Sequence, residues 1–287
     1  MKPAAFDYHR PTTLSEAISL LGEFSDGAQI LAGGQSLIPM MSLRMSRPDH
    51  VVDINRIAQL SRLERKDAWL CIGALVRHEI LERSSLAYET CPLLGRAASL
   101  IGDRQIRARG TIGGSLALSY PGAEWPTAVL AVGAQIIIAG TQGERTIPAD
   151  EFFFDVMSTA LQAGEILTEV RVPVFDENVR WAFEEYPFKP SGFAIASCAL
   201  TLRVDANERC YDTRLVVGGA GPVPLRIPEA EAAVDGQSLS DALIEDIAEI
   251  AFRTVDPSGD AHASGEYRRT MARNCVRRAL KTLSKKR

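Results

Sequence analysis

The chain has 287 residues, with 36 acidic and 32 basic side chains, so its formal net charge is −4. Apolar residues make up 46% of it and charged residues 24%, as in ordinary folded proteins. The length allows two or three domains. The negative charge excludes a general electrostatic grip on nucleic acid.

The sequence predicts neither a membrane span nor a secretory leader. The first ten residues, MKPAAFDYHR, lack the apolar region of a signal peptide. The longest apolar run, 128–139, is too short to cross a bilayer. The five cysteines are an odd number without a C-x-x-C pair, which indicates reduced thiols and no metal or iron–sulfur site on this chain. We therefore expect a cytoplasmic protein.

The first half of the chain predicts a mixture of helices and strands. Thr13 and Glu16 have the spacing of a capping box, which predicts a short amphipathic helix over 12–24. A helical turn is expected just after Ser36. Apolar patterning predicts strands over 28–33, 50–55 and 68–76, and helices over 77–85 and 91–102.

The second half predicts a helix, a hairpin and then a separate domain. The hairpin covers 134–153 with its turn at TQGE, and the stretch 175–193 is polar with two prolines, so we place a domain boundary near Val174. The other predicted elements are helices over 123–133, 238–252 and 266–280, and strands over 165–174, 193–204 and 211–221. This order indicates an α+β protein.

Two glycine segments stand out: LAGGQSLIP at 31–39 (the first glycine segment) and GTIGGSLAL at 110–118 (the second). Neither fits the Rossmann, P-loop or esterase signature. Each alone is more typical of a tight turn. Because Gln35, Ser36 and Ser115 follow the glycines, the pair predicts two opposing loops that hold a diphosphate by backbone N–H and hydroxyl groups.

The two glycine segments and the sequence around them resemble a known protein family. AGGQSLIPMMSLRMSRPDHVVDINRI and IRARGTIGGSLALSYPGAEWPTAVLAV closely resemble the FAD-binding medium subunit of the molybdenum hydroxylases, which include carbon monoxide, xanthine and N-heterocycle dehydrogenases. The resemblance continues through RTIPADEFFFDVMSTALQAGEILTEVRVP to EYRRTMARNCVRRAL. It implies an α+β fold with a vanillyl-alcohol-oxidase-type (PCMH-like) FAD-binding domain at 1–175, in subdomains 1–55 and 56–175. A C-terminal domain of the CO dehydrogenase flavoprotein type, with a three-stranded sheet and helices, follows at 176–287.

The resemblance also implies cofactor-binding residues, but no catalytic residue and no metal ligand. Ile101 and Leu167 match apolar residues that line the FAD site, Glu124 matches an acidic residue that hydrogen-bonds the cofactor, and Phe193 lies near the flavin ring. The matches to the two diphosphate-binding loops are Ala32, Gly33, Gly34, Gln35, Ser36 and the adjacent Leu37, then Thr111, Ile112, Gly113, Gly114 and Ser115.

The same resemblance implies partners. By this resemblance we expect a large subunit that carries the molybdenum cofactor, a small subunit that carries two [2Fe–2S] clusters, and an assembly that is a dimer of heterotrimers. Electrons enter FAD on this chain and leave to an external acceptor such as NAD, a quinone, O₂ or a carrier protein.

Three departures keep other functions open. Leu118 and Tyr120 stand where many relatives carry His and Asp, and Glu184 stands where some carry a cofactor-contacting Lys. One alternative is a binding or assembly module of the same fold without flavin, and another is a stand-alone flavin oxidase. A visible spectrum tests the first, and turnover without partners tests the second.

Other polar or aromatic residues favour structural roles. Asp53 and Asn55 are typical of a strand end and turn, and Trp125 is expected in the core. Arg104, Arg107 and Arg109 are equally consistent with steering an anion or partner and with a solvated surface.

Overall fold

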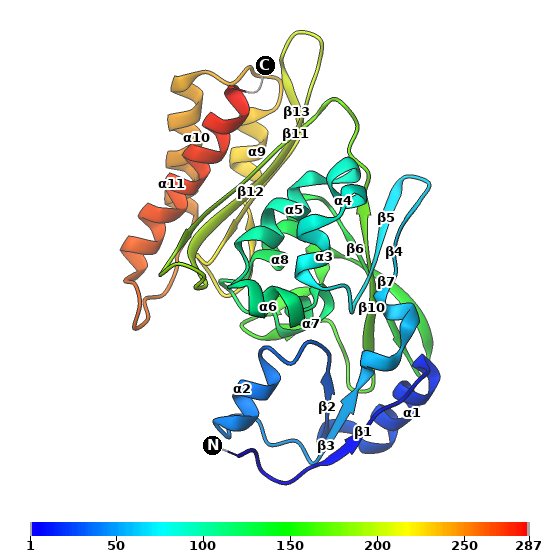
Figure 1. The fold of residues 1–287 in the computed structure, drawn as a ribbon. Coiled ribbons are helices and arrows are strands. Elements are labelled where there is room, and N and C mark those ends of the chain that lie inside the picture. Colours follow the sequence, from blue (N-terminus) through cyan, green and yellow to red (C-terminus); the bar gives the residue numbers. More distant parts are fainter. Residues whose placement is uncertain (1, 286–287) are drawn as a thin grey trace.

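The computed structural model describes residues 2–285. Three sheets of three to five strands follow one another along the chain, each with its own helices, and a two-stranded sheet accompanies the second. Figure 1 shows the first sheet at the bottom and the C-terminal sheet at the top. The α+β class is therefore confirmed.

The first sheet is parallel, in the order β1-β3-β2. Thr13 Oγ1 accepts the N–H of Glu16 at 3.2 Å, as the capping box predicts, while the Glu16 carboxylate accepts the N–H of Thr12 at 2.9 Å. The elements of this part are β1 (Asp7–His9), α1 (Leu14–Phe24), β2 (Ala28–Leu31), α2 (Leu37–Ser42) and β3 (His50–Asp53), with short 3-10 turns at Ser25–Gly27, Ile54–Arg56 and Ala58–Ser61.

The second sheet is antiparallel, in the order β4-β5-β10-β6-β7. The predicted hairpin is present, and its strands close at the pair Gly140 and Gly143. The strands are β4 (Leu63–Lys66), β5 (Trp69–Gly73), β6 (Gln135–Gly140), β7 (Gly143–Pro148) and β10 (Ile166–Pro173), with the small pair β8 (Phe153–Asp155) and β9 (Ser158–Thr159) and a 3-10 turn at Ala149–Glu151. The helices are α3 (His78–Arg83), α4 (Ser85–Thr90), α5 (Pro92–Leu100), α6 (Arg104–Arg109), α7 (Ile112–Leu118) and α8 (Glu124–Ala131).

The second glycine segment is a helix start rather than a loop. Helix α7 begins at Ile112, and Thr111 Oγ1 caps it by accepting the N–H of Gly114 at 3.1 Å. Glycine inside a helix costs about 0.5–1 kcal/mol relative to alanine, which is why the sequence indicated a turn. Close packing explains Gly113 in this helix, since a Cβ there would lie 2.5 Å from the Cβ of Ala74.

The C-terminal sheet is antiparallel, in the order β11-β12-β13-β14. The expected three-stranded sheet is present as β11 (Val179–Pro187), β12 (Ala194–Val204) and β13 (Cys210–Gly218), and the two-residue β14 (Leu225–Arg226) adds an edge. Strand β11 was missed because its charges and prolines suggested a linker. The helices here are α9 (Pro228–Val234), α10 (Asp241–Thr254) and α11 (Gly265–Ser284).

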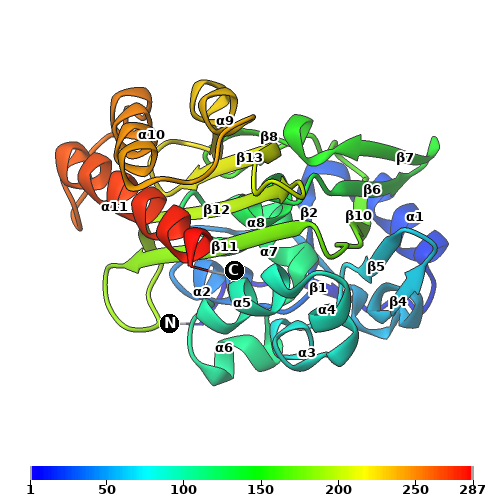
Figure 2. The same cartoon turned by 90° about the horizontal axis from the view of Figure 1, so that it is seen from above.

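Helices cover both faces of the C-terminal sheet. Figure 2 shows α9, α10 and α11 on one side and α8 and α5 on the other. Phe183, Ala199 and Val216 of the sheet belong to the same buried apolar cluster as helix α8. Because this core is shared, the C-terminal sheet is held firmly against helices α5 and α8.

The five cysteines are buried and free. Between residues 2 and 285, no helix combines the length and the apolar character that a membrane crossing requires.

Candidate cofactor site

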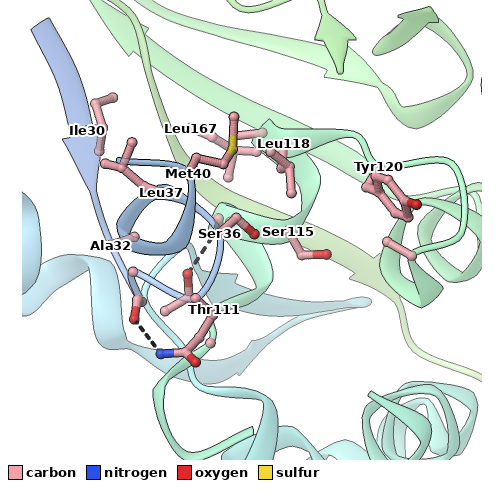
Figure 3. A pocket seen from close by; sticks show the side chains of 18 of the residues that line it. Ile30, Ala32, Ser36, Leu37, Met40, Thr111, Ser115, Leu118, Tyr120 and Leu167 are labelled. Atoms are coloured by element: carbon pink, nitrogen blue, oxygen red, sulfur yellow. Dashed lines mark hydrogen bonds between the residues drawn. The ribbon is translucent and has the colours of Figure 1, made fainter. Parts of the chain in front are cut away.

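One large cavity, of about 900 Å³, lies where the three parts of the chain meet. Its walls come from the first glycine segment, helix α7, the start of β10 and the loop before β12. Figure 3 shows Ala32, Ser36 and Leu37 beside Thr111 and Ser115, with Leu167 and Leu118 above and Tyr120 at the far side. Residues more than 100 positions apart in sequence therefore share one hollow.

Every predicted site residue except Ile112 lines this cavity. Ile112 is fully buried in the core of the middle part, and its N–H donates to Val76 O at 3.1 Å. A position next to two glycines in sequence thus points away from the hollow, because side chains of a helix start diverge around its axis.

The first glycine segment offers free backbone donors. Among residues 2–285, none accepts a hydrogen bond from the N–H groups of Gly34, Gln35, Ser36 or Leu37. Gly34 has φ +72°, a left-handed conformation that glycine adopts without strain. Successive N–H groups turned to one side in this way form a binding site for an anion.

The second glycine segment offers hydroxyls instead. Its backbone N–H groups are occupied: Gly113 donates to Ala74 O at 2.9 Å, Gly114 to Thr111 Oγ1 at 3.1 Å and Ser115 to Thr111 O at 3.1 Å. Ser115 Oγ hydrogen-bonds to no described residue, and Gly114 is exposed toward the cavity. The expectation that both segments present backbone donors therefore holds only for the first.

The two segments touch each other. A Cβ on Gly33 would lie 2.4 Å from Arg109 O and 2.8 Å from Gly110 Cα. They form one continuous wall, whereas the sequence suggested two opposing loops. Glycine at position 33 is required by this backbone contact.

A polar network behind the wall joins the segments. Asn55 Nδ2 donates to Ala32 O at 2.8 Å, and its own backbone N–H donates to Asp53 Oδ1 at 2.9 Å, which confirms the predicted turn. The guanidinium of Arg77 donates to Asn55 Oδ1 at 2.6 Å and also to Arg109 O. Arg77 thus links the first segment to the second, a role that no local pattern around it signals.

The buried side chains of His78 and Trp125 lie under the second glycine segment. Trp125 Nε1 donates to His78 Nδ1 at 2.9 Å, and both residues are buried, as expected for Trp125. Burial, with the charges of Arg77 and Arg107, lowers the pKa of His78 to about 3, so the ring is neutral and can accept this bond. A Cβ on Gly110 would lie 2.5 Å from His78 Nε2, so the segment packs directly on this ring.

The aromatic end of the cavity contains two of the departures. Tyr120 and Phe193 have ring centroids 4.3 Å apart, and Phe193 is 53% exposed. Leu118 also lines the hollow. Glu184 does not, because it accepts from Thr282 Oγ1 at 3.4 Å on the opposite face of the sheet.

Glu124 is the buried acid of the cavity, with 3% of its surface exposed. Burial, together with the negative charge of Glu185, raises the pKa of Glu124 to about 8. Near neutral pH its carboxyl therefore keeps a proton and can donate a hydrogen bond into the cavity.

Basic residues from distant positions also reach the cavity. Arg268 donates to Ile195 O and Gly219 O, both at 2.9 Å, and pairs with Asp260 at 2.6 Å. His262 lines the same rim. Sequence patterns could not find them, because helix α11, which carries Arg268, and the loop before it, which carries His262, reach the cavity only in the folded chain.

Arg107 has a structural role. Its guanidinium pairs with Glu82 at 2.9 Å and donates to Ile101 O at 3.1 Å and Gly102 O at 2.9 Å. Neither alternative considered for it, steering or simple solvation, describes these contacts. Among the residues that the structure describes, no cluster of three or more His, Cys, Asp or Glu side chains could hold a metal ion.

Known families match both parts of the chain. Residues 4–175 match the family described as the FAD binding domain in molybdopterin dehydrogenase, and residues 181–283 match the CO dehydrogenase flavoprotein C-terminal domain. The fold and the cavity are thus those of a flavoprotein component of an oxidoreductase. The chain belongs to the FAD-binding medium subunits of the carbon monoxide dehydrogenase and xanthine dehydrogenase family.

Individual relatives cover almost the whole chain. The carbon monoxide dehydrogenase medium chain of Hydrogenophaga pseudoflava is 36% identical over 280 residues, covering 98% of this chain and 97% of that one. The 6-hydroxypseudooxynicotine dehydrogenase complex subunit alpha of Paenarthrobacter nicotinovorans is 38% identical, covering 98% and 95%. The solved carbon monoxide dehydrogenase from H. pseudoflava, at 37% identity, superposes with a TM-score of 0.96 over 99% of this chain and 98% of that chain.

The residues present fit FAD. The free N–H groups of the first segment suit a diphosphate, which carries about two negative charges, and the side chains of Ser36 and Ser115 add hydroxyl donors. Ile101, Leu167 and Leu118 provide apolar walls for ring systems. Glu124 adds one protonated carboxyl.

Proposed function

We propose that this chain passes electrons through FAD, receiving them from [2Fe–2S] clusters on a small partner subunit and delivering them to an external acceptor. Bound FAD accepts electrons one at a time and releases two together, which is the redox chemistry that the site needs. Several relatives are named as parts of multi-chain enzymes, such as the "Nicotine 6-hydroxylase medium subunit" and the "Caffeine dehydrogenase subunit beta". These names support a division of labour among chains.

The observation that carries the proposal is the cavity itself. Within one hollow of about 900 Å³ it combines a turn of backbone donors, two hydroxyls and an aromatic end, and no residue between 2 and 285 hydrogen-bonds to those donors or hydroxyls. We assign the diphosphate to the first glycine segment, with Ser36 and Ser115 as hydroxyl donors. We assign the flavin ring to the end with Tyr120 and Phe193.

In this assignment the chain's own residues bind and orient. The first segment fixes the diphosphate, and the exposed Gly114 leaves room for it beside Ser115. Apolar Ile101 and Leu167 exclude water from the rings. Glu124 offers its proton to a cofactor acceptor atom, since it is un-ionised near neutral pH.

The wider arrangement belongs to the same proposal. The molybdenum cofactor lies on a large partner subunit, and two such heterotrimers pair in the cytoplasm. Residues 1–175 form the FAD-binding domain in subdomains 1–55 and 56–175, and residues 176–287 form the C-terminal domain. The three sheets, which fall within 7–53, 63–173 and 179–226, support this division.

The test compares complexes with and without flavin. The chain is purified with the subunits that accompany it, reduced anaerobically with a limiting amount of dithionite, and mixed with a benzoquinone. Cluster reoxidation is followed by electron paramagnetic resonance. We expect it to slow at least tenfold when flavin is removed and to recover when FAD is added back.

Other outcomes identify the alternatives. Equal reoxidation rates with and without flavin would contradict the electron-transfer role. A colourless complex that takes up no added FAD would indicate the assembly module. Turnover of an organic substrate by the isolated chain would indicate a stand-alone oxidase.

A further inference from the structure

A row of polar residues crosses the C-terminal sheet on the face that packs against helix α8. Glu185 of β11 pairs with Ser197 of β12, and Ser197 pairs with Gly218 of β13. A Cβ on Gly218 would lie 2.6 Å from Ser197 Oγ and 2.1 Å from Thr127 Oγ1 on α8. Both hydroxyls therefore border one small space, which exists because residue 218 has no side chain.

Helix α8 continues this row to the flavin cavity. Glu124 begins the helix one turn before Thr127, so both residues lie on the same helix face. Glu124 lines the cavity, and Thr127 is fully buried. The row thus runs from the sheet to the cofactor site through the protein interior.

Two atoms of this row have no partner. Thr127 Oγ1 and Glu185 Oε2 are buried and hydrogen-bonded to nothing within the described part of the chain. A buried polar group without a partner costs about 1–3 kcal/mol. Because these two polar groups lower the stability of an otherwise well-packed interface, we infer that they have a function other than stabilising the fold.

The other end of the row approaches the surface. Glu185, Ser99 and Arg107 line a second, smaller hollow of about 240 Å³. This hollow shares Gly102 and Ser191 with the flavin cavity. Glu185 lines only the smaller hollow, and Glu124 lines only the larger one.

Burial favours a retained proton on both carboxyls. Burial raises the pKa of Glu185 to about 7, against the opposing charge of Arg96 on α5. From the other side of the sheet, the thiol of Cys275 on α11 is neutral, because burial raises its pKa to about 12. Arg107 on α6 borders the smaller hollow but is paired with Glu82. A further titratable group near Glu185 is Glu124, on α8.

We propose that Glu124 and Glu185 form a proton store for the flavin cavity, with Glu124 as the donor that faces the cofactor and Glu185 as the positioning residue that reloads it from the smaller hollow. The inference rests on the proposed electron transfer through FAD. When the partner's clusters deliver two electrons, one at a time, a flavin takes up at least one proton. That proton leaves the Glu124 carboxyl, Glu185 transfers its proton to the resulting carboxylate, and solvent reprotonates Glu185.

The direct test is redox-difference infrared spectroscopy of the FAD-loaded complex, with dithionite as reductant. The spectra are recorded by rapid mixing, before solvent has reprotonated the two carboxyls, and we expect a transient loss of the C=O stretch of a protonated carboxylic acid, with a shift of that band in D₂O. Glu124→Gln should abolish the change. Glu185→Gln should move the pH at which the band disappears to lower values, because a neutral amide no longer raises the pKa of Glu124.

Glu184→Gln is the matched control, since its side chain points to α11 on the opposite face of the same strand. It should leave the band and its pH dependence as in the parent. No protonated-carboxyl change in the parent, or an unchanged band in Glu185→Gln, would overturn the proposal. Because dithionite reduces the flavin directly, this result is independent of whether the partner's clusters do so.

Discussion

The two glycine segments look alike in sequence but have different backbone conformations and different roles in the cavity wall. In the first, Gly33 permits backbone contact with Arg109 and Gly110, and Gly34 adopts a left-handed conformation that frees a series of N–H groups. In the second, the glycines lie in the first turn of α7, and their N–H groups are already hydrogen-bonded.

A Gly-Gly pair shared by two segments therefore does not imply a shared backbone conformation. The first segment supplies backbone N–H donors. The second lets the cofactor approach its backbone closely and supplies hydroxyl groups. Substitutions in the two segments should therefore separate loss of folding stability from loss of cofactor binding.

The largest effect is expected for Gly33→Ala. The new Cβ would meet backbone atoms at 2.4 and 2.8 Å, which cannot move without separating the two segments. We expect a loss of about 1–3 kcal/mol in the free energy of unfolding and at least a tenfold weaker FAD affinity. Denaturant unfolding and flavin fluorescence measure these quantities.

Gly22→Ala is the control for that change. Its Cβ would make only an ordinary contact, 3.6 Å from Thr141 Cγ2, within helix α1. It should keep FAD affinity and gain up to about 1 kcal/mol of stability. Equal behaviour of the two variants would refute the close contact at Gly33.

Gly114→Val should affect binding more than folding. Gly114 is not left-handed, and its nearest neighbour for a new Cβ is Thr111 Oγ1 at 2.8 Å, so the change disturbs a helix cap worth about 0.5–2 kcal/mol. The branched side chain would project into the cavity, and we expect at least a tenfold loss of FAD affinity by equilibrium dialysis. Parental affinity in a folded variant would show that the diphosphate lies elsewhere.

Arg77→Met should loosen the link between the segments. It removes hydrogen bonds to Asn55 Oδ1 and Arg109 O, and bonds from charged donors contribute about 1.5–3 kcal/mol each at most. We expect a several-fold weaker FAD affinity with the fold retained. Arg83→Met, exposed at the end of the following helix, should behave like the parent. A similar loss in both variants would argue for a non-specific charge effect.

The smallest effect near neutral pH concerns His78. Its folded pKa of about 3 lies below the ordinary value of 6.5, so below pH 6.5 the unfolded chain binds one more proton than the folded chain. Its stabilising contribution is complete above that pH and falls by about 1.4 kcal/mol per pH unit on acidification toward pH 3. Unfolding of the parent and of His78→Asn between pH 4 and pH 7 should therefore converge as the pH falls, and parallel curves would contradict a buried neutral ring.

Much of the fold was predictable from local patterns. The capping box at Thr13 and the hairpin at TQGE appear where expected, because these signals act over a few residues. Strand β11 and helix α7 were missed for a common reason. Packing against other parts of the chain overrides the local preferences of charged residues and of glycine.

The site was predictable only in part. The resemblance identified residues that line the cavity, but Ile112 shows that neighbours in a motif can point in different directions. Arg77, His78 and Arg268 carry no local signal, because their roles depend on contacts over long sequence distances. Glu185 is informative only once the sheet places it behind Glu124.

Competition binding tests most directly whether the first glycine segment holds the diphosphate of FAD. The chain in its complex is stripped of flavin and titrated with FAD in the presence of ADP or AMP, which differ by one phosphate. We predict that ADP displaces FAD at least tenfold more effectively than AMP, and that Gly114→Val removes this difference. Equal competition by ADP and AMP in the parent would contradict the account.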